Sequence, residues 1–78
     1  MTIEVLGPGC AKCQTLAENA KAAIEKLGLD CELVKVSEID EIVKRGVMMT
    51  PALIVDGVVR SVGRVVSADQ IASFLEGD

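Results

Sequence analysis

Apolar residues recur every three or four positions along one long stretch near the N-terminus. The residues in this register are Cys13, Leu16, Ala17, Ala20, Ala23, Ile24 and Leu27. Charged residues such as Glu18, Lys21 and Glu25 fall between them. This period predicts an amphipathic helix from Ala11 onward. Gly28 follows the last apolar residue and favours the left-handed backbone of a helix C-cap.

Four short apolar runs favour β-strands. The first, Ile3 to Leu6, is stopped by Gly7-Pro8-Gly9, and the second covers Cys31 to Val36. The other two lie within TPALIVDGVVRSVG, on either side of Asp56-Gly57. Because the Asp-Gly pair favours a type I′ turn, this segment predicts an antiparallel hairpin.

Two further helices are predicted from capping boxes. Ser37, with Asp40 three residues later, predicts a helix from Ser37 to about Arg45 that Gly46 closes. Ser67 with Gln70 predicts a last helix, whose apolar face is Ile71, Phe74 and Leu75. The expected order is therefore β-α-β-α-β-β-α.

This order predicts an α/β fold. A helix between two strands implies a right-handed crossover and a parallel pair, and the hairpin adds two antiparallel strands. We expect a four-stranded mixed sheet flanked by three helices, in a single domain that spans residues 1–78.

Composition excludes several classes of partner. The chain carries 12 acidic and 8 basic residues, a net charge of −4, and Phe74 is its one aromatic residue. Nucleic acid is therefore not an expected partner, since binding needs clustered cations and stacking aromatic rings. No apolar run is long enough to cross a bilayer and the N-terminus has no signal-peptide pattern, so we expect a cytoplasmic protein without membrane contact. We also expect a monomer.

The chemistry most visible in the sequence is the pair Cys10 and Cys13. Cys10 follows Gly7-Pro8-Gly9 and precedes the long helix, where backbone N–H groups and the helix dipole favour a thiolate. Lys12, between the two cysteines, would add to this effect if its side chain turns toward them. Cys13 lies one helical turn later, so the pair suits thiol–disulfide exchange, with Cys10 as nucleophile and Cys13 as resolving thiol.

Three other interpretations of the pair stay open. Both cysteines could be small buried core residues. They could instead hold a soft metal ion, Cu(I) or Zn, although small carriers of that kind have a hairpin directly after the first helix, and this chain has a helix there. The domain could also be an adaptor without turnover. Cys31 is interpreted as a buried small residue or, less simply, a regulatory thiol.

Two motifs together carry a family resemblance. GPGCAKC and GVMMTPALIVDG resemble the small archaeal and bacterial thioredoxin/glutaredoxin-like proteins often labelled redox-active disulfide proteins, over essentially the whole chain. The resemblance implies a minimal thioredoxin fold and a disulfide oxidoreductase. It implies no cofactor beyond a redox-active Cys10–Cys13 disulfide. The expected partners are protein disulfide substrates and a reductase that the sequence does not identify.

The resemblance also implies site residues around the cysteines. Pro51 matches a proline that follows a cis peptide bond and faces the disulfide, and Thr50 offers backbone hydrogen bonds to a substrate strand. Gly9 stands where conventional thioredoxins carry tryptophan, and we place it with Thr50, Pro51 and Met49 in the substrate-binding surface.

Four residues near this surface keep two interpretations each. Glu4 lies six residues before Cys10, the offset of a buried proton-transfer acid in conventional thioredoxins, or it is an outward-facing strand carboxylate. Met49 and its neighbour Met48 form either an apolar rim for substrates or part of the core. Gly63 matches a family glycine that permits close approach near the site, or is an ordinary loop residue.

Overall fold

The computed structural model of the chain describes residues 1–9 and 11–76. Its elements, in order, are β1 (Thr2–Leu6), α1 (Ala11–Leu27), β2 (Glu32–Val36), α2 (Ile39–Lys44), β3 (Ala52–Val55), β4 (Val58–Val62) and α3 (Ala68–Leu75). The predicted β-α-β-α-β-β-α order is confirmed. None of the helices in the described residues has the length and apolar character needed to cross a membrane.

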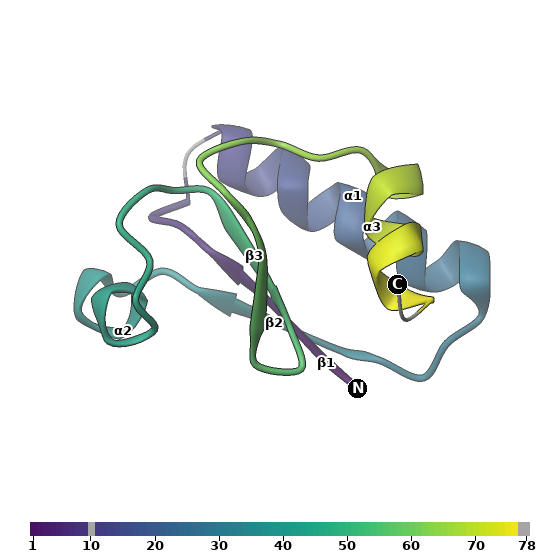
Figure 1. Cartoon of the computed structure of the whole chain (residues 1–78). Helices are drawn as coiled ribbons and strands as arrows, with labels where there is room; N and C mark the ends of the chain where they lie inside the picture. Colours follow the sequence, from purple (N-terminus) through teal and green to yellow (C-terminus); the bar gives the residue numbers. More distant parts are fainter. Residues whose placement is uncertain (10, 77–78) are drawn as a thin grey trace.

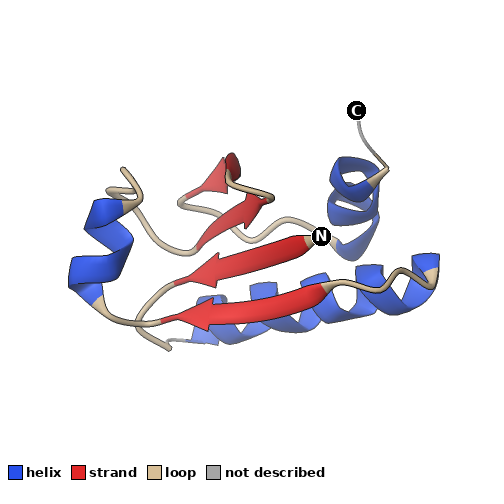
Figure 2. Ribbon diagram, turned by 90° about the horizontal axis from the view of Figure 1, so that it is seen from below, coloured by secondary structure: helices blue, strands red, loops and turns tan. Residues whose placement is uncertain are grey.

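The four strands form one mixed sheet in the order β2-β1-β3-β4. β1 pairs in parallel with β2, and β3 is antiparallel to both β1 and β4. Figure 2 shows β1 and β2 running side by side, with α1 extending along them as the crossover element that joins a parallel pair. The α/β fold with a mixed sheet and three helices is as predicted.

The helices divide between the two faces of the sheet (Figure 1). α1 and α3 pack on one face, whose buried residues are Ile3, Val5, Leu16, Ala17, Ala20, Ala23, Leu53, Val55, Val66, Ile71, Ala72 and Leu75. α2 packs on the other face, over the smaller cluster of Leu6, Val36, Ile42, Val47, Ala52 and Ile54. Alternate residues of β1 therefore serve the two cores, as the two-residue repeat of a strand requires.

The β3–β4 hairpin turns as predicted. Asp56 and Gly57 both have positive φ, 49° and 84°, which is the conformation of a type I′ turn. Asp56 also joins the turn to the start of β1. Its N–H donates to the carbonyl oxygen of Thr2 at 2.8 Å, and its Oδ1 accepts from the N–H of Thr2 at 2.8 Å.

One irregularity in the hairpin is not visible in the apolar pattern. Leu53 pairs with Ser61 but Ile54 pairs with Val59, so Arg60 is an extra residue in β4, a β-bulge. The Arg60 guanidinium lies over the ring of Phe74, 5.9 Å from its centroid, in a cation–π contact with α3.

The two predicted capping boxes have different outcomes. The Ser67 hydroxyl accepts a hydrogen bond from the N–H of Gln70 at 3.1 Å, as expected for an N-cap. The prediction for Ser37 is wrong, because the N-cap of α2 is Glu38 and no side chain caps it. The carbonyl of Glu38 accepts from the N–H of Ile42 at 3.0 Å, so Ser37 lies one residue too early to cap the helix.

An exposed ion pair connects α1 and α3 and generates a pH prediction. Lys26 Nζ lies 2.6 Å from Asp69 Oδ1. The hydrogen bond from Lys26, and then its charge, lowers the pKa of Asp69, and the same pair raises the pKa of Lys26. The pair therefore stabilises the fold at pH values above the ordinary aspartate pKa of about 3.9. This contribution is lost as the pH falls through the lower pKa that Asp69 has in the folded protein. On the alkaline side it is lost as the pH rises through the raised pKa of Lys26.

We expect Asp69→Asn to lower the urea midpoint, followed by circular dichroism, more at pH 6 than at pH 3. A Lys26→Met background is the control, because the pH-dependent part of the effect should become smaller there. Any remaining effect reflects the place of Asp69 in the first turn of α3. An equal effect of Asp69→Asn at both pH values would contradict the prediction.

Candidate functional site

The structure places one of the two motif cysteines. Cys10, the predicted nucleophile, lies outside the described residues. Cys13 is the third residue of α1, and its exposed fraction is 5%. It faces the sheet, as the apolar register predicts.

Cys13 is seated against the backbone of Gly7, at the end of β1. A Cβ atom on Gly7 would overlap Cys13 Sγ, and it would lie 3.0 Å from Cys13 Cβ and 3.8 Å from Thr50 Cβ. The N–H of Gly7 donates to the carbonyl of Val36 at 2.8 Å, which holds this backbone against the end of β2. Sequence reasoning treated Gly7 only as the end of a strand. The one available signal was a glycine directly after the last strand residue.

A cavity of about 170 Å³ opens beside Cys13 on the α1 side of the sheet. Val5, Ala17 and Lys35 are among the residues that line it. Lys35 is a basic residue that the sequence analysis did not single out. Its register opposite Val5 places both residues on the sheet face toward α1. The alternation of side chains along β2 would have placed Lys35 on this face, once it was known that Cys13 packs against the same face of the sheet.

Glu4 lies on the opposite sheet face from Cys13, among the residues that α2 covers. Its Oε1 accepts hydrogen bonds from Arg45 Nη2 at 2.9 Å and Nε at 3.1 Å. Arg45 also contacts Glu41, and its hydrogen bonds to Glu4 raise its pKa above the ordinary value. The Glu4 side chain is 21% exposed, so it is a largely buried, paired carboxylate that the structure does not bring beside Cys13.

The remaining motif residues lie around the start of α1. Lys12 is exposed in the first turn. Gly9 is exposed with a φ of 92°, which is a backbone conformation that favours glycine. The Gln14 side chain donates to the carbonyl of Gly9 at 3.1 Å and so connects the loop to the helix.

The Thr50–Pro51 bond is cis, the conformation that the family resemblance implies at this place. Pro51 is buried and Thr50 is exposed. The Pro51 carbonyl accepts a hydrogen bond from the N–H of Gly63 at 2.8 Å. In the described part of the chain, Thr50 Cβ would lie 3.8 Å from a Cβ atom on Gly7, so the segment before β3 and the start of α1 meet at the end of β1.

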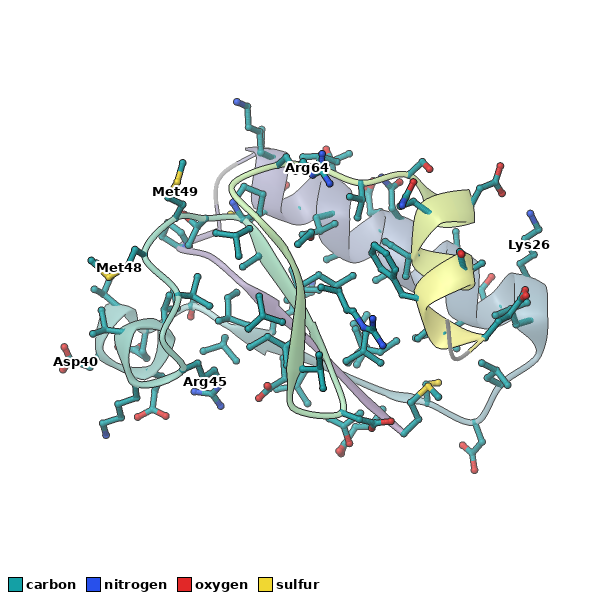
Figure 3. All side chains as sticks on the ribbon, in the orientation of Figure 1. Lys26, Asp40, Arg45, Met48, Met49 and Arg64 are labelled. Carbon is teal, nitrogen blue, oxygen red and sulfur yellow. The ribbon has the colours of Figure 1, made fainter. Side chains whose placement is uncertain are left out.

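Met48 and Met49 project outward from the segment before β3 (Figure 3). Their exposed fractions are 86% and 61%, so the interpretation that they belong to the core is wrong. Met49 packs on Gly63, where an added Cβ would lie 3.1 Å from Met49 Cε. Gly63 also has a φ of 77°. It is therefore a close-approach glycine rather than an ordinary loop residue.

Among residues 1–9 and 11–76, no three His, Cys, Asp or Glu side chains gather in a group that could hold a metal ion.

The fold and the site together define a thioredoxin-like α/β domain with a buried cysteine at the start of its first helix. A family model described as a thioredoxin domain matches residues 1–76. The chain is 43% identical to a thioredoxin of Methanothermobacter thermautotrophicus over 75 aligned residues. The alignment covers 96% of this chain and 97% of that protein. It is 40% identical to a thioredoxin of Methanocaldococcus jannaschii over an alignment of 81 positions, which covers 99% of this chain and 93% of that protein. The chain belongs to the thioredoxin family.

The close approach of Gly7 and Cys13 generates a stability prediction. Gly7→Ala should destabilise the fold by about 1–3 kcal/mol, the usual cost of overpacking a tight contact. Gly7 is buried and its φ is not positive, so steric overlap rather than backbone strain is the cause. Urea unfolding followed by circular dichroism measures the effect, since the chain has no Trp or Tyr.

A double-variant cycle tests the cause. Cys13→Ala removes the sulfur that a Gly7 Cβ would overlap, so Gly7→Ala should cost less in the Cys13→Ala background than in the unmodified chain. If the changes in the free energy of unfolding from the two substitutions were additive, the contact with Cys13 Sγ would not be what excludes a side chain at position 7.

Proposed function

We propose that the protein is a thiol–disulfide oxidoreductase that reduces or exchanges disulfides of other proteins through Cys10 and Cys13. The observation that carries the proposal is that Cys13, three residues after Cys10 in a thioredoxin-family chain, is buried and packed against the backbone of Gly7. A resolving thiol needs this protection, because it should react with the mixed disulfide next to it and not with solutes.

The reaction balances with two electrons. The Cys10 thiolate attacks one sulfur of a substrate disulfide, so that a mixed disulfide forms and the other substrate sulfur leaves as a thiolate that takes up a proton. Cys13 then loses its proton and attacks the Cys10 sulfur. The second substrate thiolate leaves and is protonated, and the protein retains a Cys10–Cys13 disulfide.

Three features support a substrate surface around this pair. Thr50 is exposed beside the Gly7–Cys13 contact, and its backbone is proposed to pair with a substrate strand. Pro51, Met49 and Gly9 complete the surface, with Met49 offering a flexible apolar side chain. Lys12 is proposed to favour the thiolate of the pair by its charge. Glu4 is left out of this proposal, since Arg45 holds it on the other face of the sheet.

The proposed reaction needs electrons from a reductase or from another thiol pool, and needs no prosthetic group. A reducing compartment keeps such a dithiol ready for reaction, so we propose that the protein acts in the cytosol. We propose that it works as a monomer.

The division of roles between the cysteines is tested by trapping. Cys13→Ser should accumulate mixed disulfides with proteins of a cell extract through Cys10, because the resolving thiol is gone, whereas Cys10→Ser should trap far less. Non-reducing gels and peptide mass spectrometry identify the linked cysteine. Both variants are made in a Cys31→Ser background as well, as the control for the third thiol. Trapping through Cys13 or Cys31 would show that the nucleophile is assigned wrongly.

The redox couple itself is tested by equilibration with a dithiothreitol series without oxygen, followed by maleimide quenching and intact mass. We expect a reversible two-electron transition confined to Cys10 and Cys13, between about −180 and −300 mV. If the pair stayed reduced throughout, or reacted with maleimide only after a chelator was added, metal binding would replace the redox proposal.

A further inference from the structure

Met49 carries an oxidisable sulfur that the proposed exchange reaction does not use. Its side chain is 61% exposed, and Figure 3 shows it projecting from the segment before β3. A thioether has no proton to lose, so it takes no part in disulfide exchange. The reaction open to it is oxidation to the sulfoxide, which turns a flexible apolar side chain into a polar one.

The end of the Met49 side chain lies on the backbone of Gly63. A Cβ atom on Gly63 would be 3.1 Å from Met49 Cε and 3.6 Å from Met49 Sδ. The N–H of Gly63 donates to the carbonyl of Pro51 at 2.8 Å. The thioether is therefore in contact with backbone that is hydrogen-bonded to Pro51, on a side chain that a small solute can reach.

An oxygen atom on Met49 Sδ would change this surface in two ways. A sulfoxide oxygen accepts hydrogen bonds, so beside Gly63 it would compete with the Pro51 carbonyl for the Gly63 N–H. The same polar group would raise the free-energy cost of covering Met49 with a substrate, because a polar group buried without a partner loses its hydrogen bonds to water. Both effects act on the proposed substrate surface of Thr50, Pro51 and Met49.

The other two methionines of the chain are also accessible, but they occupy different places. Met48 is 86% exposed and faces the α2 side, and Met1 is 49% exposed at the N-terminus. In the described part of the chain, the three heavy atoms closest to a Cβ on Gly63 all belong to Met49. Exposure makes all three methionines targets of an oxidant, and the contact with Gly63 distinguishes Met49.

We propose that Met49 is a reversible oxidation site whose sulfoxide slows disulfide exchange with protein substrates. The inference rests on the proposed function and adds its regulation. Hydrogen peroxide transfers one oxygen atom to Met49 Sδ, so that the O–O bond breaks, an S–O bond forms and water leaves. The sulfur is oxidised by two electrons and the peroxide is reduced by two. The reverse reaction takes two electrons and two protons from thiols of a methionine sulfoxide reductase and releases water.

The first measurement asks whether Met49 is oxidised. The protein, in a Cys31→Ser background and with Cys10 and Cys13 first oxidised to a disulfide, is treated with hydrogen peroxide. Tandem mass spectrometry then follows the sulfoxide of each methionine. A variant with all three cysteines replaced by alanine gives the same measurement without any thiol chemistry. Met49 should be converted in both proteins, together with the other two methionines.

The second measurement compares rates of disulfide exchange. Peroxide is removed, the protein is reduced with dithiothreitol, which leaves sulfoxides intact, and the excess is removed. The reduced protein is mixed with insulin, which is a protein disulfide, or with hydroxyethyl disulfide, and maleimide quenching with intact mass gives the rate of thiol loss. Treated protein should react with insulin about three- to tenfold more slowly than untreated protein. The rate with hydroxyethyl disulfide should not change, because this molecule is too small to cover Met49.

Matched variants assign the effect to one methionine. Each variant is compared with its own untreated sample, so that the effect of the substitution itself cancels. Peroxide should no longer slow the reaction of Met49→Leu with insulin, because leucine has no sulfur to oxidise. Met48→Leu and Met1→Leu should keep the full sensitivity to peroxide.

The outcomes separate the inference from the proposed function. If untreated protein reacts with both disulfides and the rate with insulin is unchanged after Met49 is oxidised, the inference is wrong and the redox function stands. The inference is also overturned if Met49 resists peroxide while Met48 and Met1 are converted, if Met49→Leu keeps the sensitivity, or if the rate with hydroxyethyl disulfide falls equally. If untreated protein reacts with neither disulfide, both the inference and the proposed function fail.

Discussion

The close approach of Gly7 and Cys13 is the constraint on which the rest of the site depends. There is no room for a side chain at position 7, because the Cys13 sulfur occupies that space. The same glycine donates to Val36 and lies near Thr50, so one backbone unit joins the end of β1 to β2, to α1 and to the segment before β3. A side chain there would push α1 away from the sheet and separate the cysteine motif from Thr50.

The two faces of the sheet differ in the size of their cores and in what lies beside them. The α1 and α3 face holds the larger core and the cavity beside Cys13. The α2 face has a small core, and α2 contributes only Ile42 to it. A helix of six residues with one buried side chain needs another attachment, which Arg45 supplies through its hydrogen bonds to Glu4 on β1. This pair therefore holds α2 against the sheet.

Local signals predicted the fold, and contacts distant in sequence decided the site. The three- and four-residue period of α1, the Asp56-Gly57 turn and the Ser67 cap act over a few residues, so they are visible in the sequence and they hold. The Ser37 prediction is wrong because Asp40 stands where a capping box has Glu or Gln, whereas Ser67 is followed by Gln70. The Arg45–Glu4 pair joins residues 41 apart, and no sequence pattern marks such a pair.

The structure also restricts the side from which a substrate can approach. Cys13 is 5% exposed and seated against backbone, so a partner cannot reach the pair by way of Cys13. The segment that meets the motif at Gly7 exposes the side chains of Thr50, Met48 and Met49. Unbranched methionine side chains adapt to surfaces of different shape, so this exposed segment beside the motif is able to fit partners of more than one shape.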